Sequence, residues 1–103
     1  MVELSAATWN IVQKLFLPEY QQEVGQLLEY ECGNNLPFCE NSDKEDLERI
    51  RFAVLKMSKG DIDKLRRVIK LAQEDWRDVL MGAGFENSVT AHQDWEKKLS
   101  DGV

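Results

Sequence analysis

Apolar residues recur at intervals of three and four positions along most of this chain, and strictly alternating apolar and polar stretches are not found. Residues three and four positions apart lie on one face of an α-helix, so this spacing is typical of amphipathic helices. The pattern predicts an all-α fold, a single-domain bundle of four to five helices over residues 1–103. The expected helices are 5–17, 18–32, 43–59, 61–82 and 90–99.

A proline separates the two N-terminal helices. Pro18 disfavours the helical conformation of the residue before it and suits the first position of a new helix, so 5–17 ends where 18–32 begins. Inside the second of these helices, Gly25 costs roughly 1 kcal/mol relative to alanine. We interpret it either as a close approach of another helix or as a weak position in the helix.

A helical hairpin is the best-defined part of the pattern. Ser42 followed by Glu45 matches a capping box that opens 43–59. Gly60 suits a left-handed cap and directly precedes 61–82. The apolar stripe of the second helix repeats by three and four and consists of Ile62, Leu65, Ile69, Ala72, Trp76 and Val79. A short coiled coil and an intramolecular bundle both need such a stripe, and we favour the bundle.

Two local features are expected near the end of the second hairpin helix. Asp75 is a credible second N-cap, which predicts a kink in the helix at this point. Gly84 is the expected left-handed C-cap, and it would place Phe85 against Leu80 in the apolar contact of a Schellman turn.

The C-terminal helix, 90–99, is short and carries few apolar residues, so it must dock on the other helices to persist. Trp95 is its expected anchor. His92, the only histidine, lies four residues before Glu96 on the same predicted helix face. We interpret it as a surface histidine paired with an acid, in preference to a metal ligand or a general base.

The net charge of −6 is unevenly distributed. Residues 1–42 carry one base and six acids, residues 43–72 carry nine bases and six acids, and residues 73–103 carry three bases and seven acids. The hairpin therefore holds most of the basic residues. Spacings such as that of Glu48 and Arg51 predict a solvated helix face with ion pairs along each helix.

The sequence carries no catalytic, cofactor-binding or metal-binding signature. Cys32 and Cys39 are too far apart for the usual zinc spacing of two to four residues, and whether they form a disulfide stays open. The glycines Gly82 and Gly84 follow a helix, whereas a phosphate site needs glycines before one. We expect no metal, no cofactor and no catalytic residue.

A membrane protein is not expected either. No apolar run approaches the roughly 20 residues that span a bilayer, and the first residues lack the basic and apolar regions of a signal peptide. These features lead us to expect a cytoplasmic protein.

Nucleic-acid binding through the hairpin is one functional hypothesis. Four basic residues of its second helix lie where a recognition helix would be: Lys64, Arg66, Arg67 and Lys70. The candidate nucleic-acid face consists of Arg66, Arg67 and Lys70. Against it, Asp61 and Asp63 occupy the end that such a helix points at the groove, where carboxylates would face phosphates.

Two stretches between Leu47 and Trp95 carry a resemblance. Residues 51–56 read Arg-Phe-Ala-Val-Leu-Lys, and residues 75–85 read Asp-Trp-Arg-Asp-Val-Leu-Met-Gly-Ala-Gly-Phe. In these the chain resembles a group of short, uncharacterised bacterial all-α proteins that share the segments Arg-Phe-Ala-x-Leu-Lys and Asp-Trp-Arg-Asp-x-Leu-x-x-Ala-Gly-Phe. The resemblance implies a bacterial origin and no particular activity.

The preferred functional hypothesis is a non-enzymatic protein-interaction or regulatory module that associates with itself or binds a basic partner. Its candidate acidic surface consists of Glu19, Glu23, Glu74, Asp75 and Asp78. Nucleic-acid binding through the basic face of residues 43–72 is the alternative, and an enzyme with an unrecognised site comes third.

Overall fold

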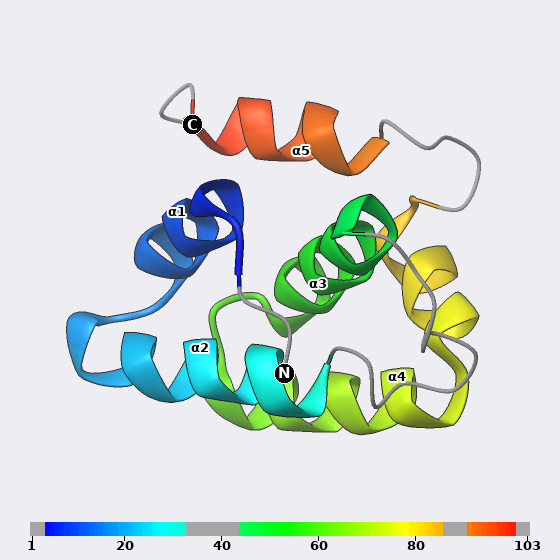
Figure 1. The fold of residues 1–103 in the computed structure, drawn as a ribbon, viewed down its shortest axis with the longest axis horizontal. Helices are drawn as coiled ribbons and strands as arrows, with labels where there is room; N and C mark the ends of the chain where they lie inside the picture. The colour runs from blue at the N-terminus through cyan, green and yellow to red at the C-terminus, as the bar shows by residue number, and fades with distance from the viewer. Residues whose placement is uncertain (1–3, 33–43, 86–90, 101–103) are drawn as a thin grey trace.

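The computed structural model describes residues 4–32, 44–85 and 91–100, and in these residues all regular structure is helical. The elements are α1 (Ala6–Leu15), α2 (Pro18–Glu31), α3 (Lys44–Ser58), α4 (Ile62–Ala83) and α5 (Ala91–Ser100). Figure 1 shows their arrangement, with α3 at the centre. The all-α bundle expected from the apolar spacing is confirmed, and each helix end lies within two residues of its predicted position.

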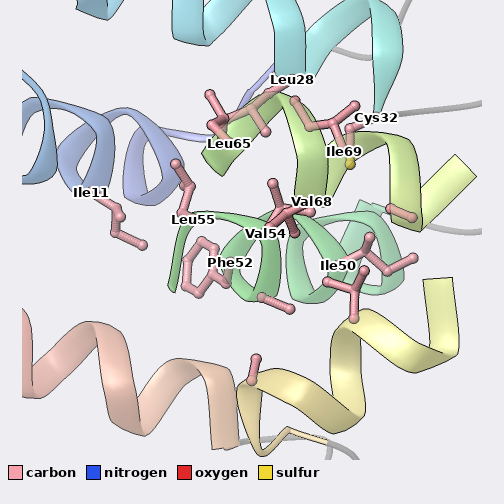
Figure 2. Close-up of a cluster of buried hydrophobic side chains, with 14 of the residues drawn as sticks. Ile11, Leu28, Cys32, Ile50, Phe52, Val54, Leu55, Leu65, Val68 and Ile69 are labelled. Atoms are coloured by element: carbon pink, nitrogen blue, oxygen red, sulfur yellow. The ribbon is translucent and has the colours of Figure 1, made fainter. Parts of the chain in front are cut away.

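The middle of α3 is buried on every side. Six consecutive residues expose 2% of their surface or less: Ile50, Arg51, Phe52, Ala53, Val54 and Leu55. In Figure 2, Val54 lies beside Val68 of α4, while α5 and the end of α4 lie on the opposite side of α3. A helix that is buried all round forms the interior of the fold, and its neighbours form the layers around it.

Trp9 of α1 packs against the only glycine inside α2. An added Cβ on Gly25 would lie 2.2 Å from Cη2 of Trp9 and 2.8 Å from Cζ3, so the indole occupies the place of a side chain. Gly25 is therefore a site of close approach, which was one of the two interpretations of its position in the helix. The contact joins α1 to α2, and Val24 and Leu28 on either side of the glycine are fully buried.

The turn between α3 and α4 contains two residues with left-handed backbone. Gly60 has a φ of 79°, as expected for a left-handed cap, and Lys59 before it has a φ of 53°. A Cβ on Gly60 would lie 2.7 Å from the carbonyl oxygen of Leu15, so the turn also lies against the end of α1. Both the backbone conformation and this close approach favour glycine at position 60.

The predicted kink in α4 is confirmed at Asp75. This residue has φ −156° and ψ 98°, an extended conformation inside a run of 22 residues that is otherwise helical. Its Oδ1 accepts a hydrogen bond of 3.0 Å from the backbone amide of Arg77, so it caps the second part of the helix. This second part, in yellow in Figure 1, turns away from the axis of the first part.

The C-terminal end of α4 is closed by the predicted turn and by cations from α3. Gly84 is left-handed with a φ of 80°, and the amide of Phe85 donates to the carbonyl of Leu80 over 2.9 Å. Lys56 Nζ donates to the carbonyl of Ala83 over 2.8 Å, and Arg49 donates to the carbonyl of Phe85. These two cations therefore bind the end of α4 from the neighbouring helix α3.

Helix α5 docks through an aromatic cluster in which His92 takes part. The His92 ring centroid lies 5.3 Å from that of Phe52 and 6.3 Å from that of Phe85. Trp95, the expected anchor, lies 6.2 Å from Phe52 and 6.0 Å from Phe85. The expectation of a surface histidine was wrong, because His92 exposes only 3% of its surface. Its predicted helix face turns toward α3.

We predict that Gly25→Ala lowers the free energy of unfolding by about 2 kcal/mol, because the new methyl group overlaps the Trp9 indole and forces repacking. Urea denaturation followed by circular dichroism measures the loss. Gly82→Ala is the matched control, since that methyl group meets only the flexible end of Met57 and position 82 is exposed. A change below about 1 kcal/mol is expected there. Equal losses in the two variants would contradict the close packing at Gly25.

Candidate interaction surfaces

Three exposed acids of α4 gather around its kink. Glu74, Asp75 and Asp78 are all exposed, and Met81 exposes 56% of its surface. Asp78 and Met81 lie three positions apart in the second part of α4, with Asp75 three positions earlier at its cap, so these three residues follow one helix face. We call Glu74, Asp75, Asp78 and Met81 the kink surface. It combines three carboxylates with an exposed apolar side chain.

The other two acidic candidates lie elsewhere. Glu19 is exposed in the first turn of α2, which begins on the side of the molecule away from the second part of α4 (Figure 1). Glu23 forms an ion pair with Arg66 of α4. The structure therefore brings together Glu74, Asp75 and Asp78 and leaves Glu19 and Glu23 outside this group. Because Glu23 is paired, its charge is partly compensated within the protein.

The basic candidates divide in the same way. Arg67 and Lys70 are exposed on α4, whereas Arg66 reaches across to Glu23 of α2. The side chains of Arg66 and Glu23 expose 53% and 45% of their surface, so the pair contributes at most about 1 kcal/mol to stability. One of the three cations of the proposed nucleic-acid face is thus engaged with an acid of the proposed protein-binding surface.

Arg51 corrects the expectation of a fully solvated basic face. It exposes 2% of its surface, and its Nε donates to the carbonyl of Cys32 over 2.9 Å. Removal from water lowers the pKa of the Arg51 guanidinium, and the negative charges of nearby Glu29 and Glu48 oppose this shift. The guanidinium serves to join α3 to the end of α2.

The burial of Arg51 had a signal in the sequence that the charge pattern obscured. Arg51 lies four residues after Leu47 and three before Val54, so it occupies the apolar stripe of α3. Glu48, its expected partner on the helix surface, accepts a hydrogen bond from the Ser5 hydroxyl at the start of α1. The spacing of opposite charges suggested exposure, whereas the spacing of apolar residues correctly indicated burial.

The described residues were also compared with the requirements of a metal site and of a membrane-spanning helix. Across residues 4–32, 44–85 and 91–100, no three histidine, cysteine or acidic residues form a group that could hold a metal ion. None of the helices in this part of the chain is long and apolar enough to cross a membrane. The possible pairing of Cys32 with Cys39 lies outside the described residues, because position 39 is not among them.

Several apolar side chains are exposed, and nothing in the sequence predicted their exposure. In the described part of the chain, the large hydrophobic residues with exposed surface are Leu17, Tyr20, Tyr30 and Met81. Leu17 and Tyr20 lie at the corner between α1 and α2, and Met81 belongs to the kink surface. Of these four residues, only Met81 belongs to the kink surface, where it lies with Glu74, Asp75 and Asp78.

Comparisons with known proteins leave the chain without an assigned family. No protein-family model matches it, and no significant match is found among curated proteins or solved structures. The resemblance of residues 47–95 to a group of bacterial proteins therefore stays a prediction.

We predict that Arg51→Ala lowers the free energy of unfolding by about 3 kcal/mol, because it leaves the buried carbonyl of Cys32 without its donor and opens a cavity beside α3. Urea denaturation measures the effect. Arg67→Ala is the matched control, because it makes the same chemical change at an exposed position, and a change within about 0.5 kcal/mol is expected. Similar values for both variants would show that Arg51 is not a structural residue.

Proposed function

We propose that this protein is a non-enzymatic interaction module that binds a basic segment of another protein through the kink surface. The supporting observation is the placement of Asp75, Asp78 and Met81 along one exposed helix face, with Glu74 beside them. Carboxylates attract lysine and arginine side chains, and the exposed thioether of Met81 adds an adaptable apolar contact. This combination suits a partner helix or loop that carries both basic and apolar residues.

Charge supports a basic partner over a nucleic acid. The net charge of −6 disfavours approach to phosphates, and four of the nine hairpin cations have partners within the protein. Arg51 is buried, Arg49 and Lys56 bind carbonyls at the end of α4, and Arg66 pairs with Glu23. Nucleic-acid binding through Arg67 and Lys70 is left as an outcome of the test below.

The proposed setting is the bacterial cytoplasm. Its support is the resemblance of residues 47–95 to short bacterial proteins and the acidic composition of the chain. A small acidic module of this kind would act as an adaptor, inhibitor or regulator of the protein that it binds.

The test compares the unchanged chain with two variants, each immobilised, for their ability to retain proteins from a bacterial lysate with and without nuclease treatment. Glu74→Gln combined with Asp78→Asn removes two charges from the kink surface without changing Asp75, the cap of the helix. We expect binding of a basic protein to weaken roughly fivefold relative to the unchanged chain, because each exposed ion pair contributes up to about 1 kcal/mol. Quantitative mass spectrometry at low and moderate salt measures the retention.

Asp63→Asn combined with Asp94→Asn is the matched control, since it removes two exposed charges away from the kink surface. This variant should retain the partner as well as the unchanged chain does. Equal loss in both variants, or a retained partner that is insensitive to salt, would contradict the proposal. Loss of all binding on nuclease treatment would favour the nucleic-acid alternative.

A further inference from the structure

The break at Asp75 divides α4 into two parts that lie on different sides of α3. The first part contributes Leu65, Val68 and Ile69 to one side (Figure 2). The second part lies with α5 on the other side, in both views of the molecule. All described residues after the break therefore form one unit that is joined to the preceding helix at a single position.

This unit is held by contacts with α3, and its helix α5 also contacts α1. Lys56 and Arg49 bind the carbonyls of Ala83 and Phe85, and the ring of Phe52 contacts His92 and Trp95 of α5. Lys56 also lies over the ring of Phe85, with Nζ 5.0 Å from its centroid. Such contacts require an α3 helix, but they do not require that this helix belong to the same chain.

The local sequence allows the break through the cap at Asp75, but neither proline nor glycine forces it. Sharp kinks are almost always found at proline, glycine or inserted groups, and residues 73–77 contain neither proline nor glycine. The extended conformation of Asp75 is one that any residue can adopt. The apolar stripe also continues through the break without a change of spacing, since Ala72, Trp76 and Val79 are four and three positions apart. The same residues are patterned for one continuous helix.

Two arrangements of α4 therefore compete. The bent helix gains the cap from Asp75 to Arg77 and the contacts of the second part with α3. A straight helix regains backbone hydrogen bonds across the break but moves the second part away from its own α3. The lost contacts can then be restored by the α3 of another copy.

We propose that α4 straightens at Asp75 and that two copies of the chain then exchange the unit after the hinge, each placing it on the α3 of the other. In this dimer, Lys56 and Arg49 of one copy bind Ala83 and Phe85 of the other through the same hydrogen bonds as in the monomer. The straightened α4 of 22 residues is about 33 Å long, given a rise of 1.5 Å per residue. This proposal does not depend on the kink surface.

Asp75→Ala tests the exchange, because it removes the cap of the bent form and introduces a better helix former. The ratio of exchanged dimer to monomer is expected to rise at least about fivefold. Asp75→Asn is the matched control, since its side-chain oxygen preserves the cap while its charge is lost. Within one chain, the unit after the hinge meets its own α3 at an effective concentration on the order of millimolar. Both variants are therefore refolded at millimolar protein concentration, so that the α3 of another copy can compete. Light scattering measures the mass.

The decisive readout is contact between the rings of Phe52 and His92, whose centroids are 5.3 Å apart. Isotope-labelled and unlabelled Asp75→Ala chains are refolded together, and isotope-filtered nuclear Overhauser spectra select contacts between chains. The exchange predicts a Phe52–His92 signal between the two kinds of chain. A dimer without this signal, or an Asp75→Ala protein that stays monomeric, overturns the proposal.

A second variant covers the case in which Asp75→Ala does not fold. Asp75→Gln also lacks the short capping side chain and favours a helix, so the same increase and the same signal are expected. If Asp75→Asn forms as much dimer as these two variants, the proposal is also overturned. The cap would then have no part in keeping α4 bent.

Discussion

Burial of α3 on every side is the constraint on which the other elements depend. Its middle residues expose 2% of their surface or less, so other side chains must surround it from all directions. Each large residue in this stretch contributes about 2 kcal/mol by leaving water. One chain of this length meets that demand by packing α1, α4 and α5 against α3, while α2 packs against α1 and α4 (Figure 1). The charge of Arg51 is accommodated in this interior through the backbone carbonyl of Cys32, which caps the end of α2.

The kink of α4 follows from the same demand. The helix has 22 residues and α3 has 15, so a straight α4 would extend beyond the helix that it covers. The break at Asp75 returns the second part of α4 to another side of α3, where Arg49 and Lys56 bind its final carbonyls. Two of the cations in the charge pattern of the hairpin, Arg49 and Lys56, thus contribute to architecture. Asp75 has two roles, because it caps the helix and also contributes a carboxylate to the kink surface.

Features that depend on neighbouring residues in the chain were predicted well from the sequence. The helices, the break at Asp75 and the left-handed Gly84 all arise from spacing, capping and backbone preference within a few residues. Features that depend on packing between distant elements were not. His92 and Arg51 are buried because α3 and α5 meet other helices there, and Lys56 binds a helix 27 residues away in the chain. The grouping of Glu74, Asp75 and Asp78 without Glu19 and Glu23 likewise required the positions of α2 and α4.

Native-state hydrogen exchange at the amides of α3 tests the central position of this helix most directly. If its burial supports the whole fold, the amides of residues 51–55 exchange only by global unfolding, and their protection equals the free energy of unfolding measured with urea. Amides of α5 and of the second part of α4 then exchange through smaller, local openings. Protection in α3 that is equal to or weaker than that in α5 would contradict this account.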